Sequence, residues 1–492
     1  MSKLAPINLT SLKNKQWYHQ RFDGCPLFMS YIAFAEVRQE KRKPAGTEAD
    51  VRICFFDDGK ADWYLDMKDV NRGSQALIKS AKKDKNLSIK LLAKWKNDEQ
   101  LFDQFFKKFQ KINIKQLTDS ELINLYEQYT KLSLNRFTSS AVIDHFALGT
   151  DEVVEKMLRN EVGSLLKESD FTNIFSIATA PIHQSFINQA EIDLLKIAIS
   201  SPLDKNKIKV HQQKYYWTKN NYIKAQNLSV AYFKKEINNW LKLGKDLQAS
   251  LRQLQNTPKI NKQRKEKLFK QYKFSPLLKI LLKISEDFTW WQDERKRATY
   301  LNIDIGTRIL NEMARRTGYD KESLKFLLIP EVVDWFKNKN ISQKQLNDRM
   351  KKLAMIIDRK GYQMITGAKV DEVKRITLNE NKKDEIHDIR GLSASTGRVI
   401  GKVKIIKSAT EINKIQSGDI LVAVMTRPDY IAGMKKVAAI VTNEGGITCH
   451  AAIVSRELGI PCIIGTKIAT ETFKDGEMVE VNANHGWVRK IS

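Results

Sequence analysis

The sequence predicts a multidomain α+β protein in which a large, mainly helical N-terminal and central region precedes a compact α/β domain. Three observations support this fold class. The chain has 492 residues, and single hydrophobic cores stop growing near about 250–300 residues, so we expect several domains. Its 10 Pro and 22 Gly are few for this length, which disfavours a turn-rich β architecture. The apolar pattern also changes from helical to strand-like after Gly391.

The first hundred residues predict a small mixed α/β cap. Residues 51–56 and 61–65 are short runs rich in apolar and aromatic residues, with Asp57, Asp58 and Gly59 between them. An Asp-Gly pair between two such runs is typical of a β-hairpin. We therefore expect residues 1–100 to contain a pair of strands.

Residues 101–368 predict a helical domain, because apolar residues recur there every three or four positions. One helix is expected over residues 285–316, with a stop at Gly318. A second is expected over residues 342–361, from a serine N-cap to a glycine stop. Residues 369–390 are charged and weakly periodic, so we interpret them as a linker.

Residues 391–492 predict a compact α/β module. Alternating or continuous apolar residues mark candidate strands at 399–405, 420–424, 438–441, 462–464, 478–481 and 487–488. Short helical segments separate several of these strands. A module of about 100 residues has the usual size of a domain.

The composition of the chain bears on its cellular location and on disulfide or metal sites. No stretch approaches the roughly 20 apolar residues that cross a bilayer, and the first ten residues lack the apolar core of a signal peptide. We therefore expect a soluble, cytoplasmic protein that does not contact a membrane. The four cysteines are too scattered for a disulfide framework or a zinc site, so no metal centre is predicted.

The formal charge of +27 raises the question of an anionic partner. Lys and Arg are spread along the helical patterns with no dominant block, and no helix-turn-helix, RNA-recognition or zinc-finger motif is present. We interpret most of the charge as solvated, Lys-rich helix faces. Nucleic acid is therefore not the expected partner, although a helical protein that binds an anion or a nucleic acid stays an alternative.

The residues around His450 predict a phosphate site. An apolar strand runs into Gly445 and Gly446, which allow a tight turn and close approach of a ligand. Thr448 can cap the helix that follows, and its hydroxyl can also contact a phosphate. His450 then lies in the first turn, where free N–H groups and the helix dipole favour an anion. The same field disfavours imidazolium, so a ring nitrogen stays available to attack phosphorus near neutral pH.

The segment around His450 also fits two roles that involve no phosphoryl carrier. His450 could simply be satisfied at a helix start, without chemistry. Cys449 suggests a thiolate nucleophile, but neighbouring helical residues point about 100° apart and do not pair readily. The carrier hypothesis uses the glycines, the helix start and the histidine together, so it is the one we favour.

Several segments, in order along the chain, carry a resemblance to a known family. They are residues 418–422, 426–429, 440–446, 448–452 and 456–461. Together they resemble the mobile phosphohistidine domain of phosphoenolpyruvate synthase, pyruvate phosphate dikinase and rifampicin phosphotransferase. The resemblance implies that residues 391–492 form a swivelling domain and that His450 is phosphorylated.

The resemblance also implies parts that this sequence does not show. A dikinase of this family needs an ATP-binding domain with a glycine-rich phosphate loop, and no such loop is present. We therefore expect a phosphotransferase component whose partner, a separate ATP-grasp or dikinase-like subunit, phosphorylates His450. ATP and Mg²⁺, or phosphoenolpyruvate (PEP), would act at that partner's site. No cofactor is expected to bind tightly to this chain, and the acceptor is an unidentified small molecule or protein.

A weaker resemblance concerns the helical domain. Residues 290–295 and 327–331 resemble the helical region that binds the acceptor in rifampicin-phosphotransferase-like proteins. This implies that Trp290, Glu294 and Arg295 bind the acceptor, although ordinary helix packing explains the same aromatic stripe. A non-catalytic regulatory protein with a vestigial histidine domain is a further alternative. The complete glycine turn before His450 argues against such decay.

Overall fold

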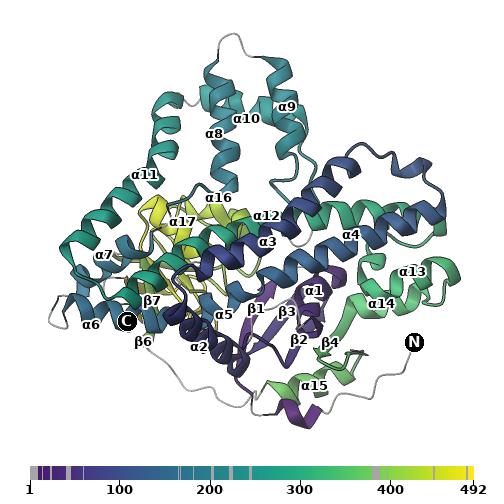
Figure 1. The fold of residues 1–492 in the computed structure, drawn as a ribbon, viewed down its shortest axis with the longest axis horizontal. Helices are drawn as coiled ribbons and strands as arrows, with labels where there is room; N and C mark the ends of the chain where they lie inside the picture. The colour runs from purple at the N-terminus through teal and green to yellow at the C-terminus, as the bar shows by residue number, and fades with distance from the viewer. Residues whose placement is uncertain are drawn as a thin grey trace.

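The computed structural model describes residues 9–491 except 14, 23–24, 40–45, 59, 164–165, 167, 181, 201–203, 221–224, 243–245, 379–387, 396, 447–448 and 484–485. Figure 1 shows an N-terminal sheet, a body of long helices, a helical arm that projects at the top, and a C-terminal domain coloured yellow. The predicted fold class is confirmed, since a mainly helical region precedes an α/β domain.

An antiparallel sheet of five strands, in the order β1-β3-β2-β4-β5, lies against the body. Its strands are β1 (Trp17–Phe22), β2 (Val51–Asp57), β3 (Lys60–Asp66), β4 (Lys352–Asp358) and β5 (Tyr362–Thr366). The predicted hairpin is confirmed as β2 and β3, which pair from Arg52 with Leu65 to Asp57 with Lys60. The other edge of β2 pairs with β4. The sheet is therefore completed by residues from beyond the helices, and the first hundred residues do not close as a cap of their own.

The prediction of a helix over residues 342–361 is wrong for its second half. The serine N-cap is confirmed, since the Ser342 side chain accepts a hydrogen bond from the backbone N–H of Gln345. However, α14 (Gln343–Lys351) stops at Lys351, and the next residues form β4. Residues 353–357 are fully buried in this central strand. A short apolar run of this kind fits a helix and a buried strand equally well, which explains the error.

The linker predicted over residues 369–390 begins later than expected. Its first part is α15 (Lys369–Thr377), whose Val370 and Val373 pack into a cluster beneath the five-stranded sheet. Asp371, Glu372 and Arg375 lie on the outer side, so the sequence looks charged although one face is apolar. Residues 379–387 of the predicted linker lie outside the described residues.

Long helices form the body. They are α3 (Leu87–Phe109), α4 (Asp119–Ser140) and α12 (Pro276–Thr317), together with α1 (Leu27–Phe34), α2 (Met67–Lys83), α5 (Val142–Gly149), α6 (Asp151–Val162), α7 (Glu168–Thr179) and α13 (Ile329–Asn338). α12 includes the predicted helix over 285–316 and ends, as expected, at Gly318 with a φ of 75°. Because 25 of its 42 residues are buried, α12 is the spine of the body. Within the described residues, no helix is both long and apolar enough to traverse a bilayer.

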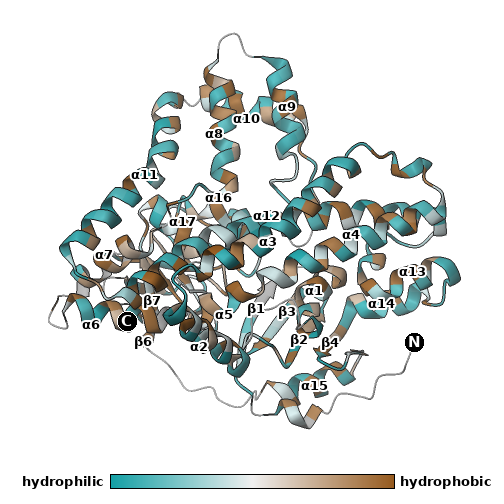
Figure 2. Cartoon of the chain, in the orientation of Figure 1, coloured by the Kyte–Doolittle hydropathy of each residue, from teal (hydrophilic) through white to brown (hydrophobic). Residues whose placement is uncertain are grey.

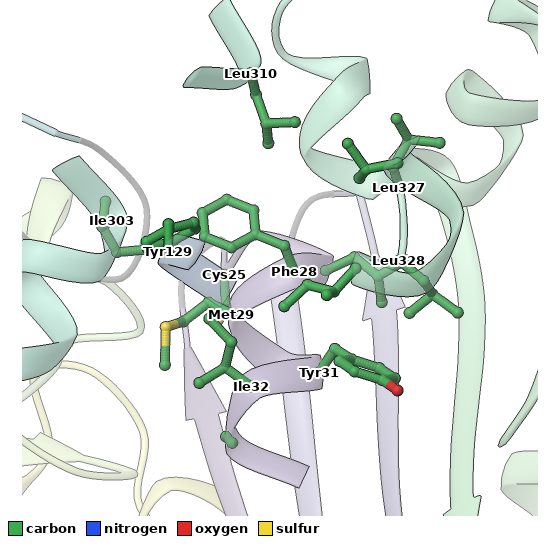
Figure 3. Close-up of a cluster of buried hydrophobic side chains, with 14 of the residues drawn as sticks. Cys25, Phe28, Met29, Tyr31, Ile32, Tyr129, Ile303, Leu310, Leu327 and Leu328 are labelled. Atoms are coloured by element: carbon green, nitrogen blue, oxygen red, sulfur yellow. The ribbon is translucent and has the colours of Figure 1, made fainter. Parts of the chain in front are cut away.

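The largest hydrophobic core joins the helices to the N-terminal sheet. Figure 3 shows Phe28 and Met29 of α1 close to Tyr129 of α4 and Ile303 of α12, and all of these residues are buried. Gly306 of α12 permits this contact, because a Cβ at that position would lie 2.9 Å from a Phe28 ring carbon and 2.7 Å from the Tyr129 hydroxyl. A larger residue would force α12 away from α1.

Four helices form the arm: α8 (Phe186–Ile199), α9 (Lys205–Tyr215), α10 (Val230–Lys242) and α11 (Leu247–Gln271). Figure 2 shows long hydrophilic stretches along them. Residues 205–275 contain 18 Lys and Arg but only three Asp and Glu. They therefore carry 15 of the 27 net positive charges, and the prediction that no block dominates the charge is wrong.

The C-terminal domain contains a mixed sheet of eight strands, in the order β6-β13-β12-β8-β9-β10-β11-β7. Its strands are β6 (Asp388–Arg390), β7 (Leu392–Ser395), β8 (Arg398–Ile405), β9 (Ile420–Ala423), β10 (Ala439–Thr442), β11 (Cys462–Ile464), β12 (Met478–Asn482) and β13 (Trp487–Lys490). All the strands predicted after residue 391 are confirmed. Leu421 and Val422 of β9 belong to different apolar clusters, so both faces of the sheet are covered.

Shorter helices complete the chain. The C-terminal domain holds α16 (Ile431–Met434), α17 (His450–Leu458) and α18 (Ala469–Thr472). The 3₁₀ helices are η1 (Leu9–Leu12), η2 (Ala35–Arg38), η4 (Ile114–Gln116), η5 (Ser323–Phe326), η6 (Ala409–Lys414) and η7 (Pro428–Tyr430). α17 follows β10, and this strand-to-helix connection positions His450.

Candidate functional site

His450 lies at the start of α17, as predicted. β10 ends at Thr442, the chain turns through Gly445 and Gly446, and Cys449 is the N-cap of the helix. Gly445 has a φ of 121°, and a Cβ there would come within 2.7 Å of the Cys449 sulfur. A side chain at this position would therefore disturb the turn and the helix start together. Thr448, predicted to cap the helix or contact phosphate, lies outside the described residues.

One hydrogen bond holds the imidazole of His450. Its Nδ1 lies 2.9 Å from Oγ1 of Thr426, and both side chains are buried. When Nδ1 carries the proton, it donates to this hydroxyl and leaves a lone pair on Nε2. Nε2 is buried and has no hydrogen-bond partner among the described residues. The ring therefore keeps Nε2 for reaction.

Burial and two cations keep this imidazole neutral. Burial lowers the pKa of His450 well below its ordinary value of 6.5, and the charges of Lys296 and Arg427 lower it further. Lys296 belongs to α12 and Arg427 precedes η7, so the body and the C-terminal domain each supply one charge. The neutral ring is the nucleophilic form, and the same cations can stabilise a phosphoryl dianion.

His450 lines a cavity of about 140 Å³ between the C-terminal domain and the body. The domain contributes Met425, Thr426, Arg427, Pro428, Glu444, Gly445, Gly446, Cys449 and His450. The sheet, α1 and η2 contribute Tyr18, Ala33, Phe34, Glu36, Arg52, Trp63 and Leu65, and the other helices contribute Phe137, Asp144, Ala147, Leu148, Gln292, Arg295, Lys296, Thr299 and Tyr300. The cavity thus joins residues that are more than 400 positions apart in the chain.

Of the three predicted acceptor-binding residues, only Arg295 lines this cavity. Its guanidinium pairs with both carboxylate oxygens of Asp144, at 2.8 Å for Nη1 to Oδ2. Trp290 and Glu294 line a separate surface groove, where Trp290 packs edge-on against Trp95. Helix geometry explains the separation, because residues 292, 295, 296, 299 and 300 share one face of α12, and 290 and 294 lie on another.

Sequence reasoning missed the N-terminal residues of the site. Arg52 of β2 and Glu36 of η2 are both buried and form an ion pair of 2.9 Å. The signal for Arg52 was its position within an apolar strand, where a charge needs a buried partner. Lys296 was also missed, although it lies on the same helix face as Arg295.

Apolar and polar contacts join the C-terminal domain to the rest of the protein, since Met425 packs on the largest core and Leu392 on a second core. The ammonium of Lys467 lies 5.6 Å from the centre of the Tyr18 ring and 3.4 Å from a carboxylate oxygen of Glu444. Burial raises the pKa of Glu444 to about 7 although Lys467 opposes the shift. On another side, the amide of Asn188 in α8 donates to Glu457 at 3.4 Å.

A second group of polar residues lies away from this cavity. His183, Glu286 and Asp287 place possible ligand atoms within 4.8 Å of one another. Lys283 contacts both carboxylates, and Lys265 lies 2.8 Å from Glu286. Because lysines already balance these carboxylates, the group has the character of an ion-pair network.

Comparison with known proteins defines the class of the C-terminal domain. Residues 415–486 match the family model of the PEP-utilising enzyme mobile domain. This confirms the resemblance found from the sequence segments, and the domain is a mobile phosphohistidine domain.

The same region is similar to phosphoenolpyruvate synthases. The probable enzyme of Methanothermobacter thermautotrophicus is 56% identical over 100 residues, which cover 20% of this chain and 15% of that one. The probable enzyme of Archaeoglobus fulgidus is 58% identical over 100 residues, covering 20% and 13%. The Escherichia coli enzyme is 50% identical over 103 residues, also covering 20% and 13%. The chain therefore matches at most 15% of the length of these three relatives.

Two solved structures overlap with about a fifth of the chain. The solution structure of a UPF0107 protein covers 21% of this chain and 99% of its own, with 20% identity and a TM-score of 0.19. The crystal structure of Thermococcus kodakaraensis aconitase X covers 21% and 98%, with 17% identity and a TM-score of 0.18. Scores this low support no functional conclusion.

Proposed function

We propose that this protein is a phosphotransferase component in which His450 carries a phosphoryl group from a donor site on a partner to an acceptor in the cavity. The observation that carries the proposal is the buried Nε2 of His450, which lacks a hydrogen-bond partner among the described residues. Lys296 and Arg427 lie close enough to depress the pKa of His450. The match of residues 415–486 to the mobile domain supports the histidine step.

The geometry allows a balanced transfer in two steps. Nε2 of His450 attacks the phosphorus of the donor, the bond to the leaving oxygen breaks, and the phosphoryl group moves to the ring. Nδ1 keeps its proton and its hydrogen bond to Thr426 throughout. In the second step a nucleophilic atom of the acceptor attacks the phosphorus and gives up its proton to solvent, the P–N bond breaks, and its electron pair returns to Nε2, so the imidazole leaves neutral. Arg427 and the N–H groups at the start of α17 move with the domain and stabilise charge on the phosphoryl oxygens in both steps, and Lys296 of α12 adds to them in the second step, inside the cavity.

The donor would be bound by another protein. The sequence contains no glycine-rich nucleotide loop, so we assign ATP and Mg²⁺ to a separate ATP-grasp or dikinase-like subunit, with PEP as the other donor. Mg²⁺ at that site would neutralise charge on the transferred phosphates. The C-terminal domain would leave the cavity to reach this partner and then return. This cycle fits the cytoplasm, where ATP and PEP are available.

Labelling tests the proposal. The protein is incubated with [³²P]ATP or [³²P]PEP, alone and with an ATP-grasp protein encoded nearby, and acid-labile, base-stable label is measured. We expect label on the wild type and on His183→Ala, whose histidine is exposed and lies outside the cavity, but none on His450→Ala. Equal label on His450→Ala and wild type, or no label under any condition, would contradict the proposal.

The arm supports a second candidate function, binding of a polyanion. Residues 205–275, which include α9, α10 and α11, carry a net charge of +15 within 71 residues, whereas the other 421 residues share +12. Binding of RNA or DNA through these lysines should weaken steeply with salt, by about 10³-fold or more between 50 and 200 mM for six or more phosphate contacts. A salt series with wild type and a Lys259→Gln, Lys262→Gln, Lys267→Gln variant measures this. Binding that is absent, or insensitive to salt, removes the second function.

A further inference from the structure

Lys296 differs from the other charged residues that line the cavity. Each of the others pairs with an oppositely charged side chain: Arg52 with Glu36 at 2.9 Å, Arg295 with Asp144 at 2.8 Å, Arg427 with Asp429 at 3.7 Å and Glu444 with Lys467 at 3.4 Å. The ammonium of Lys296 forms no hydrogen bond or ion pair with any residue that the structure describes. Its charge is therefore left unbalanced when the C-terminal domain is docked on the body.

Shielding from water makes this unbalanced charge unfavourable. Most of the Lys296 side chain is shielded from solvent. Burial lowers the pKa of Lys296 below its ordinary value of 10.5, although Asp293 and Cys449 act in the opposite direction. The Asp293 carboxylate instead accepts a hydrogen bond from the backbone N–H of Phe186, at 2.8 Å. A cation that is held away from water without a partner destabilises the arrangement that holds it.

Docking of the C-terminal domain decides what surrounds Lys296. Lys296 belongs to α12 of the body, whereas His450, Arg427 and Cys449 belong to the domain that closes the cavity over it. Once the domain leaves, water can solvate the ammonium. A domain that returns with a phosphoryl group on Nε2 brings up to two negative charges at pH 7. A domain that returns with a neutral ring brings none to the two cations beside His450.

We propose that Lys296 makes docking depend on the phosphorylation of His450, so that the loaded domain docks in the cavity and the empty domain is released. The inference rests on the proposed function and describes the regulation of the same site. Arg427 moves with the domain and accompanies the phosphoryl group everywhere, so Lys296 is the cation whose pairing depends on docking. After the phosphorylated product leaves, the Lys296 charge is unbalanced again and the empty domain returns to the donor.

Cross-linking across the interface measures docking. Asn188 of α8 and Glu457 of α17 face each other there, with side-chain atoms 3.4 Å apart. Cysteines replace both residues in the full-length protein, and a short bifunctional maleimide joins them when the domain is docked. Phosphoramidate phosphorylates His450 without a partner protein, and ³¹P NMR confirms the phosphohistidine. We expect phosphorylation to raise the ratio of docked to released protein about fivefold or more, with no such change in His450→Ala.

Variants of Lys296 test its part in this response. Unphosphorylated Lys296→Met should cross-link more than the wild type, because the unbalanced charge is gone. It should respond less to phosphorylation, because only Arg427 remains beside the new charges. Lys296→Gln should behave in the same way, whereas Lys296→Arg keeps the cation and should respond like the wild type. Lys279→Met, at an exposed position of the same helix, is the matched control and should also respond fully.

The outcomes separate this inference from the carrier function. If phosphohistidine forms on the wild type but cross-linking does not change, the inference is wrong and the carrier function stands. A full response of both Lys296→Met and Lys296→Gln would also overturn the inference, because the charge of Lys296 would then have no part in docking. If no phosphohistidine forms at His450, the carrier function itself fails and the inference falls with it.

Discussion

The two longest helices of the protein, α11 and α12, follow each other in the chain but differ in their surroundings. α12 buries 25 of its 42 residues, whereas α11 buries only Lys265 and Leu268 among 25. The cavity takes five of its lining residues from α12 and none from α11. Reactive groups need fixed positions, and a helix packed on several sides provides them.

The two helices also use charge differently. On α12, Arg295 pairs with Asp144 and Arg297 pairs with Glu99, so charged side chains connect α12 to neighbouring helices. On α11, residues such as Lys262 and Lys267 are exposed to solvent. Charged side chains of α12 therefore help to fix its packing against neighbouring helices, whereas those of α11 are available to solvent and to other molecules.

The comparison would be broken if truncating a buried apolar side chain of α12 and an exposed one of α11 had equal effects on stability. Trp291 of α12 is fully buried and packs against Trp95 and Phe288, with ring centres 5.6 Å and 5.3 Å away. We expect Trp291→Ala to lower the free energy of unfolding by about 3–5 kcal/mol. Ile260→Ala on α11, where the side chain is 44% exposed, should change it by less than about 1 kcal/mol. Urea unfolding of both variants measures the difference.

A second prediction concerns Glu444, which lines the cavity beside α12. Its pKa rises from 4.5 unfolded to about 7 folded, so the folded state binds the proton more tightly. The resulting stability is present below pH 4.5 and is lost as the pH rises to about 7, by roughly 3 kcal/mol. Glu444→Gln cannot ionise, so its stability should fall less over this range. Urea midpoints measured at several pH values test this, and parallel curves for the two proteins would contradict it.

A smaller effect is expected at His450 itself. Lys296→Met removes a cation of α12 that disfavours imidazolium, so the pKa of His450 should rise toward its ordinary value. Burial is the larger cause of the shift and stays in place, so the pKa should remain below 6.5. NMR titration of the His450 ring in the wild type, in Lys296→Met and in the control variant Lys262→Met of α11 measures the three pKa values. A pKa that responds to neither or to both substitutions would weaken the contrast between the helices.

The smallest effect should appear in the arm. Like charges repel over about 30 Å at 0.01 M salt but over only about 8 Å at 0.15 M. Added NaCl should therefore slow amide hydrogen exchange in α11 by an amount worth less than about 1 kcal/mol, with little change in α12. Exchange measured by mass spectrometry at the two salt concentrations resolves the helices, and an equal response would run against the prediction.

The sequence predicted the C-terminal domain well because its determinants are local. The strands, the glycine turn and His450 lie within about a hundred residues, and each has its own pattern. The helical repeat of α12 and its end at Gly318 were also predicted, but not which face of the helix lines the cavity. Trp290, assigned to the acceptor from the resemblance of residues 290–295, packs on Trp95 outside this cavity, and periodicity alone does not say which face of α12 meets the cavity.

The N-terminal sheet was only half predicted for a different reason. The hairpin of β2 and β3 depends on a short turn, whereas the pairing of β2 with β4 depends on contacts between distant segments. The apolar run in β4 fits a helix as well as a strand until its partner is known. For the same reason, Arg52 within an apolar strand indicated a buried partner, but the sequence did not show that this partner is Glu36.

The position of β4 in this sheet has a consequence for synthesis of the chain. β2 ends at Asp57 and its partner β4 begins at Lys352, nearly 300 residues later. A ribosome adds about 5–20 residues each second, so the apolar edge of β2 waits roughly 15–60 seconds for its neighbour. An unpaired edge of this kind invites contact with other nascent chains. The order of the strands therefore makes chaperone binding during translation an advantage for this protein.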